Sequence, residues 1–122
     1  MNIRRIRVGK RLSEICIFNN IVYLAGQVPE NTIEKGIEDQ TKEVLNMIEN
    51  LLLEIGSDKT NILQTQIFLK NIQDIHAMNK VWDAWVIEGA TPARATVQAL
   101  LADSRWLIEM VVVAAVPGSG YS

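Results

Sequence analysis

A long amphipathic stripe between residues 37 and 55 constrains the fold more than any other part of the chain. Mostly apolar residues recur there at spacings of three and four, which is the period of one helix face. They are Ile37, Thr41, Val44, Leu45, Ile48, Leu51, Leu52 and Ile55. Such a helix must bury this face against another element. We expect Asn31 or Thr32 to cap its start and Gly56 to end it in a left-handed conformation.

Short β-type runs lie on both sides of this helix. Residues 13–18 and 21–26 are separated by Asn19-Asn20, which predicts a tight hairpin because asparagine tolerates positive φ. A second helical pattern covers residues 75–86 and is followed by Gly89. The remaining β-type runs cover residues 3–8, 62–69, 93–101 and 106–116. This order predicts an α+β fold, a mixed sheet with two helices packed on one face.

The composition is that of an ordinary globular chain. The 122 residues are 48% hydrophobic and 21% charged, with a net charge of −2, so we expect one domain over residues 1–122. A slightly negative net charge is not typical of a protein that binds nucleic acid through a basic surface. The single cysteine, Cys16, excludes an internal disulfide, and one cysteine with one histidine argues against a zinc site. No signal peptide or membrane-length apolar run is readable, which predicts a cytoplasmic protein.

The last two runs predict an antiparallel hairpin that turns around Asp103 and Ser104. In that register, side chains alternate between the two faces of the sheet. One face is suited to the helices and holds Ala95, Val97, Ala99, Ile108, Met110, Val112 and Ala114. The other face is half apolar and holds Arg94, Thr96, Gln98, Leu107, Glu109, Val111 and Val113. No helix remains to cover the second face, so the pattern predicts burial against another subunit.

Arg94 and Glu109 are ionisable residues that interrupt otherwise apolar strands. The hairpin register places them on one face but roughly 13 Å apart, which is too far for a direct ion pair. Two interpretations remain open. Both can be structural charges at the rim of an oligomer interface, or Arg94 can bind a carboxylate or phosphate ligand through its planar fork.

The other chemically capable side chains favour structural interpretations. His76 is expected at the surface or as a cap, Trp82 and Trp85 in the core, and Cys16 as an inert thiol, either buried or exposed. Charged residues on the first helix are expected to face solvent, namely Asp39, Lys42 and Glu43. The sequence contains no glycine-rich phosphate loop, no Ser-His-Asp set and no metal-ligand cluster.

Several segments, taken in order over nearly the whole chain, resemble the Rid family of reactive-intermediate deaminases, also labelled the endoribonuclease L-PSP family. They are Val-Tyr-Leu-Ala-Gly-Gln-Val-Pro at 22–29, Thr-Gln-Ile-Phe-Leu at 65–69, Met-Asn-Lys at 78–80, Thr-Pro-Ala-Arg-Ala-Thr-Val-Gln at 91–98 and Leu-Ile-Glu-Met-Val at 107–111. Trp-Asp-Ala-Trp-Val at 82–86 is similar to the helix end of a short subgroup. The resemblance implies a chorismate-mutase-like fold and a homotrimer with a central barrel and intersubunit clefts. It also implies hydrolysis of 2-imino acids to 2-keto acids and ammonia, without a metal or an organic cofactor.

The resemblance also implies roles for individual residues. Arg94 matches the arginine that binds the substrate carboxylate, and Glu109 matches the carboxylate that orients or activates water. Gly26 matches a glycine whose backbone borders the pocket, and Asn79 a residue near the cleft of the adjoining subunit.

Three positions depart from the pattern of active deaminases. Leu12 stands where many have a pocket tyrosine, Ala25 where they often have serine, and Thr96 where they often have cysteine. We therefore carry three hypotheses: a deaminase, a trimeric module that binds small 2-imino or 2-keto acids without chemistry, and the ribonuclease or translation inhibitor of the family label. Physical grounds speak against the last one, because the chain lacks a basic stripe and a pair of histidines. No nucleic-acid or membrane partner is expected.

Overall fold

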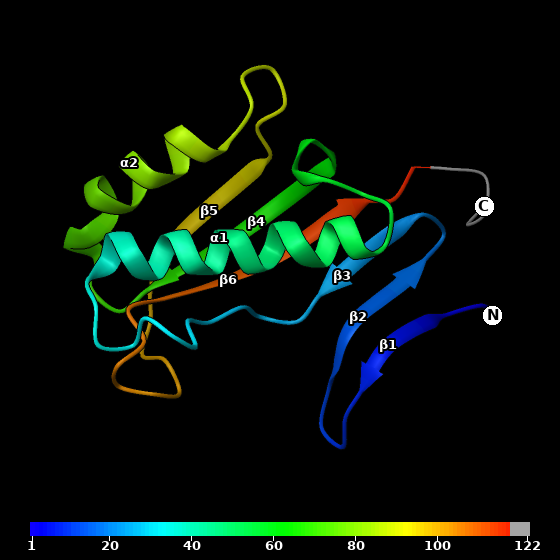
Figure 1. Ribbon diagram of the computed structural model, residues 1–122, viewed down its shortest axis with the longest axis horizontal. Coiled ribbons are helices and arrows are strands. Elements are labelled where there is room, and N and C mark those ends of the chain that lie inside the picture. Colours follow the sequence, from blue (N-terminus) through cyan, green and yellow to red (C-terminus); the bar gives the residue numbers. More distant parts are fainter. Residues whose placement is uncertain (118–122) are drawn as a thin grey trace.

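The computed structural model describes residues 1–117 as a six-stranded mixed sheet with two α-helices on one face (Figure 1). The strand order in the sheet is β1-β2-β3-β6-β4-β5. The strands are β1 (Arg4–Val8), β2 (Ser13–Phe18), β3 (Ile21–Leu24), β4 (Ile62–Leu69), β5 (Ala93–Gln98) and β6 (Ile108–Ala115). The helices are α1 (Ile37–Glu54) and α2 (Ile75–Trp85), with short 3-10 turns at Lys59–Asn61 and Ile72–Asp74. The predicted α+β fold is confirmed.

The turn residues adopt the predicted backbone conformations, but the predicted cap at the start of α1 is absent. Asn19 and Asn20 have φ angles of 52° and 65°, as a two-residue hairpin requires, and Gly56 ends α1 with φ 82°. The start of α1 differs from the prediction. Its N-cap is Gly36, with no side-chain cap. Thr32 instead hydrogen-bonds the Glu43 carboxylate, through both its backbone N–H and its hydroxyl.

The predicted hairpin between the last two strands is wrong. β5 pairs in parallel with β4, and β6 pairs antiparallel with the other edge of β4. The reason is the β4-α2-β5 crossover, because a strand that returns through a helix lies parallel to the strand it left. β6 then fills the space between β4 and β3, and residues 99–107 form a long connection rather than a tight turn.

This topology also changes which side chains of β5 face the helices. Thr65 and Ile67 of β4 are buried beneath the helices, and their direct partners in β5 are Arg94 and Thr96. In a parallel pair, directly opposed residues share a face. Arg94, Thr96 and Gln98 therefore lie on the helix side, whereas Ala95 and Val97 lie on the outer side. On β6 the prediction holds, since Ile108, Met110, Val112 and Ala114 are all buried.

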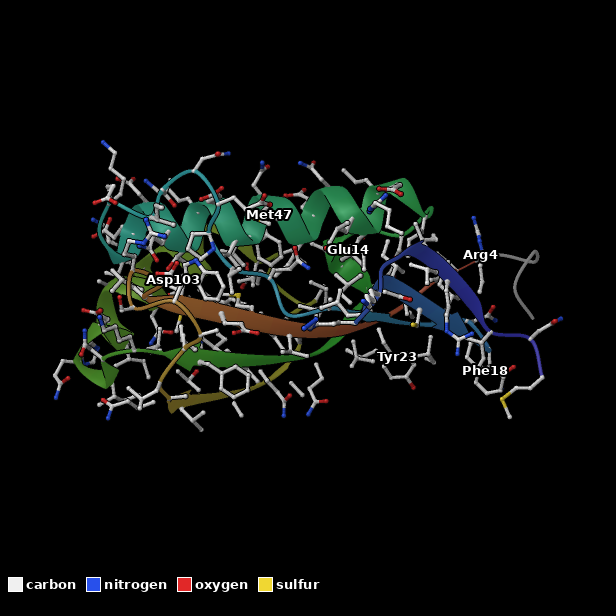
Figure 2. The ribbon with its side chains drawn as sticks, turned by 90° about the horizontal axis from the view of Figure 1, so that it is seen from below. Arg4, Glu14, Phe18, Tyr23, Met47 and Asp103 are labelled. Carbon is white, nitrogen blue, oxygen red and sulfur yellow. The ribbon has the colours of Figure 1, made fainter. Side chains whose placement is uncertain are left out.

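No helix or strand among residues 1–117 covers the sheet face opposite α1 and α2. Figure 2 shows Phe18 and Tyr23 on the side facing away from Met47 and its helix. Tyr23 is 50% exposed, and Val97 at the far edge of this face is 47% exposed. Cys16 pairs with Tyr23 across β2 and β3, so its half-buried thiol also belongs to this face. The sequence predicted a half-apolar face without helices, and the structure has one.

Candidate functional site

Glu109 lies on the outer face of the sheet with its carboxylate against the backbone of Gly26. A Cβ atom added to Gly26 would lie 2.1 Å from Glu109 Oε2, so this close approach requires glycine. The carboxylate has no hydrogen-bond donor within residues 1–117. Burial raises its pKa above the ordinary value. Glu109 is thus a partly desolvated carboxylate with free acceptor positions.

The segment beside Glu109 is held in place by Gln27, a residue that the sequence did not single out. Its backbone N–H donates to the Met110 carbonyl at 2.8 Å and its carbonyl accepts from Met110 N–H at 3.0 Å. Its side-chain Nε2 donates to Glu14 Oε1 at 2.9 Å and to the Ala25 carbonyl at 2.8 Å. Gln27 is only 3% exposed. The sequence did contain a signal for this role, since Gln27 is a glutamine within the apolar stretch after β3. A buried side-chain amide normally has hydrogen-bond partners.

Two of the three departures from the deaminase pattern lie in the β1–β2 loop and just after β3, where Ala25 directly precedes Gly26. Ala25 is hydrogen-bonded to β2, where its N–H donates to the Glu14 carbonyl at 2.9 Å. Leu12 closes the β1–β2 loop by accepting from Gly9 N–H at 2.8 Å, and its side chain is 60% exposed. Leu12 and Ala25 therefore offer apolar surface where a tyrosine and a serine would offer hydroxyl groups.

Arg94 lies at the start of β5 and is held by α2. Its Nη1 donates to Asn79 Oδ1 at 2.8 Å, and its guanidinium carbon lies 5.3 Å from the centre of the Trp82 ring. Thr96, two residues along the same face, has a buried hydroxyl oxygen with no hydrogen-bond partner among residues 1–117. The structure thus brings Arg94, Asn79 and Thr96 to the helix side of the sheet.

Arg94 and Glu109 lie on opposite faces of the sheet, contrary to the hairpin register. Glu109 pairs with Phe68 on the outer side of β4, while Arg94 pairs with the buried Thr65. Two groups on opposite faces of one sheet cannot act on one small molecule. A single chain therefore contains two separate half-sites, one around Glu109 and one around Arg94.

Two cavities of the described chain lie away from both half-sites. A cavity of 440 Å³ lies between α1 and α2, with Leu45, Val81, Ala84 and Trp85 among its lining residues. A second cavity, of 370 Å³, has Gln27, Glu14 and the Arg7–Glu54 ion pair among its lining residues. Neither is lined by Arg94 or Glu109.

Within residues 1–117, no group of three or more His, Cys, Asp or Glu side chains is placed to hold a metal ion. No helix in the same part of the chain has the length and apolar character needed to span a membrane.

The fold and these two charged positions define a small α+β protein whose sheet has helices on one face and a half-apolar surface on the other. The family model described as endoribonuclease L-PSP matches residues 2–116. A RutC family protein of Haemophilus influenzae is 53% identical over 114 residues, covering 93% of this chain and 98% of that protein. The RutC family protein YoaB of Escherichia coli K12 is 44% identical over 116 residues, covering 95% and 100%.

Solved structures agree with the sequence comparisons. An uncharacterised protein from Pseudomonas aeruginosa superposes with a TM-score of 0.92 at 41% identity, covering 95% of this chain and 100% of that chain. A Rid family protein from Yersinia pestis gives 0.79 at 32% identity, covering 89% and 90%. The chain belongs to the endoribonuclease L-PSP family, whose members also carry the names RutC, YjgF and Rid. The predicted membership is confirmed.

Proposed function

We propose that this protein is an imine deaminase that hydrolyses 2-imino acids to 2-keto acids and ammonia, acting as a homotrimer without a metal or an organic cofactor. The observation that carries the proposal is the Glu109 carboxylate, which is partly buried against Gly26 and unpartnered within the described chain. A carboxylate with a raised pKa and free acceptor positions is suited to hold a water and accept its proton.

Arg94 supplies the complementary half of the proposed site. Its guanidinium binds the carboxylate that every 2-imino acid carries, through a bidentate pair of hydrogen bonds. Because Arg94 and Glu109 lie on opposite faces of one sheet, the proposed site combines Glu109 of one protomer with Arg94 of the next. Burial of the half-apolar outer face against a neighbour is the assembly that would bring them together.

The reaction follows from these two roles. The oxygen of the held water bonds to the imine carbon while Glu109 accepts a proton from it. Glu109 returns that proton to the nitrogen, which gives a tetrahedral intermediate with one hydroxyl and one amino group. Glu109 then transfers the hydroxyl proton to the amino nitrogen as the carbon–nitrogen bond breaks. Ammonia leaves and the carbonyl of the 2-keto acid forms, so one water is consumed for each imine. Positioning and proton transfer are the contributions asked of the protein, because the imine carbon is already electrophilic.

The test is an assay in which 2-iminobutanoate and 2-iminopropanoate are generated in place and keto-acid release is followed. We expect acceleration by the wild type and its loss in Arg94→Ala and in Glu109→Gln. Mixing the two variants after reversible dissociation should restore activity, because about a quarter of the shared sites in a random mixture then hold both native groups. No acceleration by a folded wild-type oligomer would overturn the deaminase proposal, and no recovery on mixing would overturn the shared site.

A binding module without chemistry is the second candidate, and the surfaces of Leu12 and Ala25 favour it. Both replace hydroxyl groups that could contact an imine or a water with apolar atoms. In this case the wild type would bind 2-oxobutanoate saturably, Arg94→Ala would lose that binding, and no imine would be hydrolysed faster than in buffer. The same assay, combined with a ligand titration, separates the two candidates.

A further inference from the structure

We propose that Trp82 and Asn79 are positioning residues that hold the Arg94 guanidinium in place for its ligand. We expected Trp82 in the core, and the family resemblance implied that Asn79 lies near the cleft of the adjoining subunit. The structure gives both of them a contact with Arg94. This inference rests on the proposed role of Arg94 as the carboxylate-binding residue.

The two contacts restrain different motions of the guanidinium. The Trp82 ring lies beneath the cation, at 5.3 Å from ring centre to guanidinium carbon. Such a contact attracts the cation to the flat face of the ring. Asn79 Oδ1 accepts from Nη1 at 2.8 Å and thereby fixes how the group is turned over the ring.

The contacts leave the ligand-binding donors free. A guanidinium has five N–H donors, and within the described chain Asn79 is the hydrogen-bond partner of Arg94. The remaining N–H groups can therefore meet the two oxygens of a carboxylate. An arginine that is already oriented loses less side-chain freedom when it binds.

Trp82 is itself fixed by both helices. It is 6% exposed, and its ring centre lies 5.9 Å from that of Trp85. Trp85 Nε1 donates to Glu49 Oε1 of α1 at 3.1 Å, and Lys59 Nζ lies over the Trp85 ring, 5.0 Å from its centre. The support beneath Arg94 thus extends from α2 to α1, and it does not depend on one side chain alone.

The test is an equilibrium titration with 2-oxobutanoate as the probe, combined with kcat and KM where the imine assay is active. We expect Trp82→Leu to raise the Kd for the keto acid on the order of tenfold, because it removes the cation–π contact. Trp82→Phe keeps an aromatic face and should stay within about threefold of the wild type. Asn79→Ala should raise Kd and KM with a smaller change in kcat, since it leaves Glu109 untouched.

Trp85→Leu is the matched control. It removes a similar ring from the same helix, but Trp85 makes no direct contact with Arg94 in the described chain. Its Kd should rise clearly less than that of Trp82→Leu, because Trp85 reaches Arg94 only through Trp82. Equal losses in Trp82→Leu and Trp85→Leu, or unchanged Kd in both Trp82→Leu and Asn79→Ala, would overturn the inference. Arg94→Ala serves as the reference: if it binds the keto acid normally, the proposed function fails instead. Should Trp82→Leu not fold, Trp82→Phe against Trp82→Tyr and Asn79→Ala still decide the question.

Discussion

The fold partly desolvates the Glu109 carboxylate, and no group within residues 1–117 donates a hydrogen bond to it. Burial raises its pKa, so the folded chain holds its proton more tightly than the unfolded chain does. The protonated carboxyl thus favours folding at low pH, and this advantage is lost as pH rises through the raised pKa. Glu109→Gln should therefore increase the melting temperature at pH 8 by a few degrees and change it little at pH 4. Thermal unfolding at both pH values measures this, and an equal shift at both would contradict the expected linkage.

Gly26 allows the Glu109 carboxylate to reach its place. The atom that a new Cβ would meet is the end of a flexible side chain, so Gly26→Ala should fold with little loss of stability while turning Glu109 aside. We expect kcat/KM for imine hydrolysis to fall by about tenfold or more, because misplacing a catalytic group by an ångström costs this much. Gly36→Ala is the matched control, since open space surrounds that position. Full activity in Gly26→Ala would disprove the positional requirement.

At the scale of elements, Glu43 of α1 holds the loop that precedes its own helix. Its carboxylate accepts hydrogen bonds from the N–H groups of Glu30, Asn31 and Thr32 and from the Thr32 hydroxyl. The sequence placed Glu43 on the exposed side of the helix, and it is half-exposed there, but its bonds to the loop were not predicted. A carboxylate on a helix can accept hydrogen bonds from the backbone of a preceding loop. The sequence alone does not show which helical carboxylates do so.

Loss of these bonds is measurable. Burial alone would raise the pKa of Glu43, but the Thr32 hydroxyl and the three N–H groups outweigh it and lower the pKa. The stabilisation is therefore present above the ordinary glutamate pKa and is lost as pH falls through the lowered one. Glu43→Ala should reduce the free energy of unfolding by about 1–2 kcal/mol at pH 7. Asp39→Asn, an exposed charge on the same helix, should change it little under the same urea titration.

Local patterns predicted most elements, but they could not predict strand neighbours. The stripe over residues 37–55, the Asn19-Asn20 turn and the strand at 62–69 depend on nearby sequence, and all three are as expected. The partner of β5 depends on the crossover through α2, which no spacing within β5 or β6 records. That single topological choice moved Arg94 to the other face, so the residue types at the candidate site were predicted more reliably than their arrangement.

At the scale of the whole molecule, the uncovered sheet face is the surface on which the proposed assembly depends. Val113 lies at its centre, paired with Tyr23 of β3 and Gln64 of β4. Val113→Lys should place a charge in the interface and shift the protein toward monomers, because an unpaired buried charge opposes association. Light scattering coupled to size-exclusion chromatography reports the mass. Leu53→Lys, an exposed leucine on α1, should leave the mass unchanged.

The placement of Arg94 and Glu109 on opposite faces has a consequence for inheritance if the proposed site is used. A subunit that lacks both groups would spoil its own contributions to two neighbouring sites, so one defective copy in a ring of three would silence most of it. A mutant gene expressed beside a normal one would then reduce activity by more than its share of the protein. The geometry of one sheet thus makes the loss of both groups in one subunit harm two sites, whereas the loss of either group alone harms one.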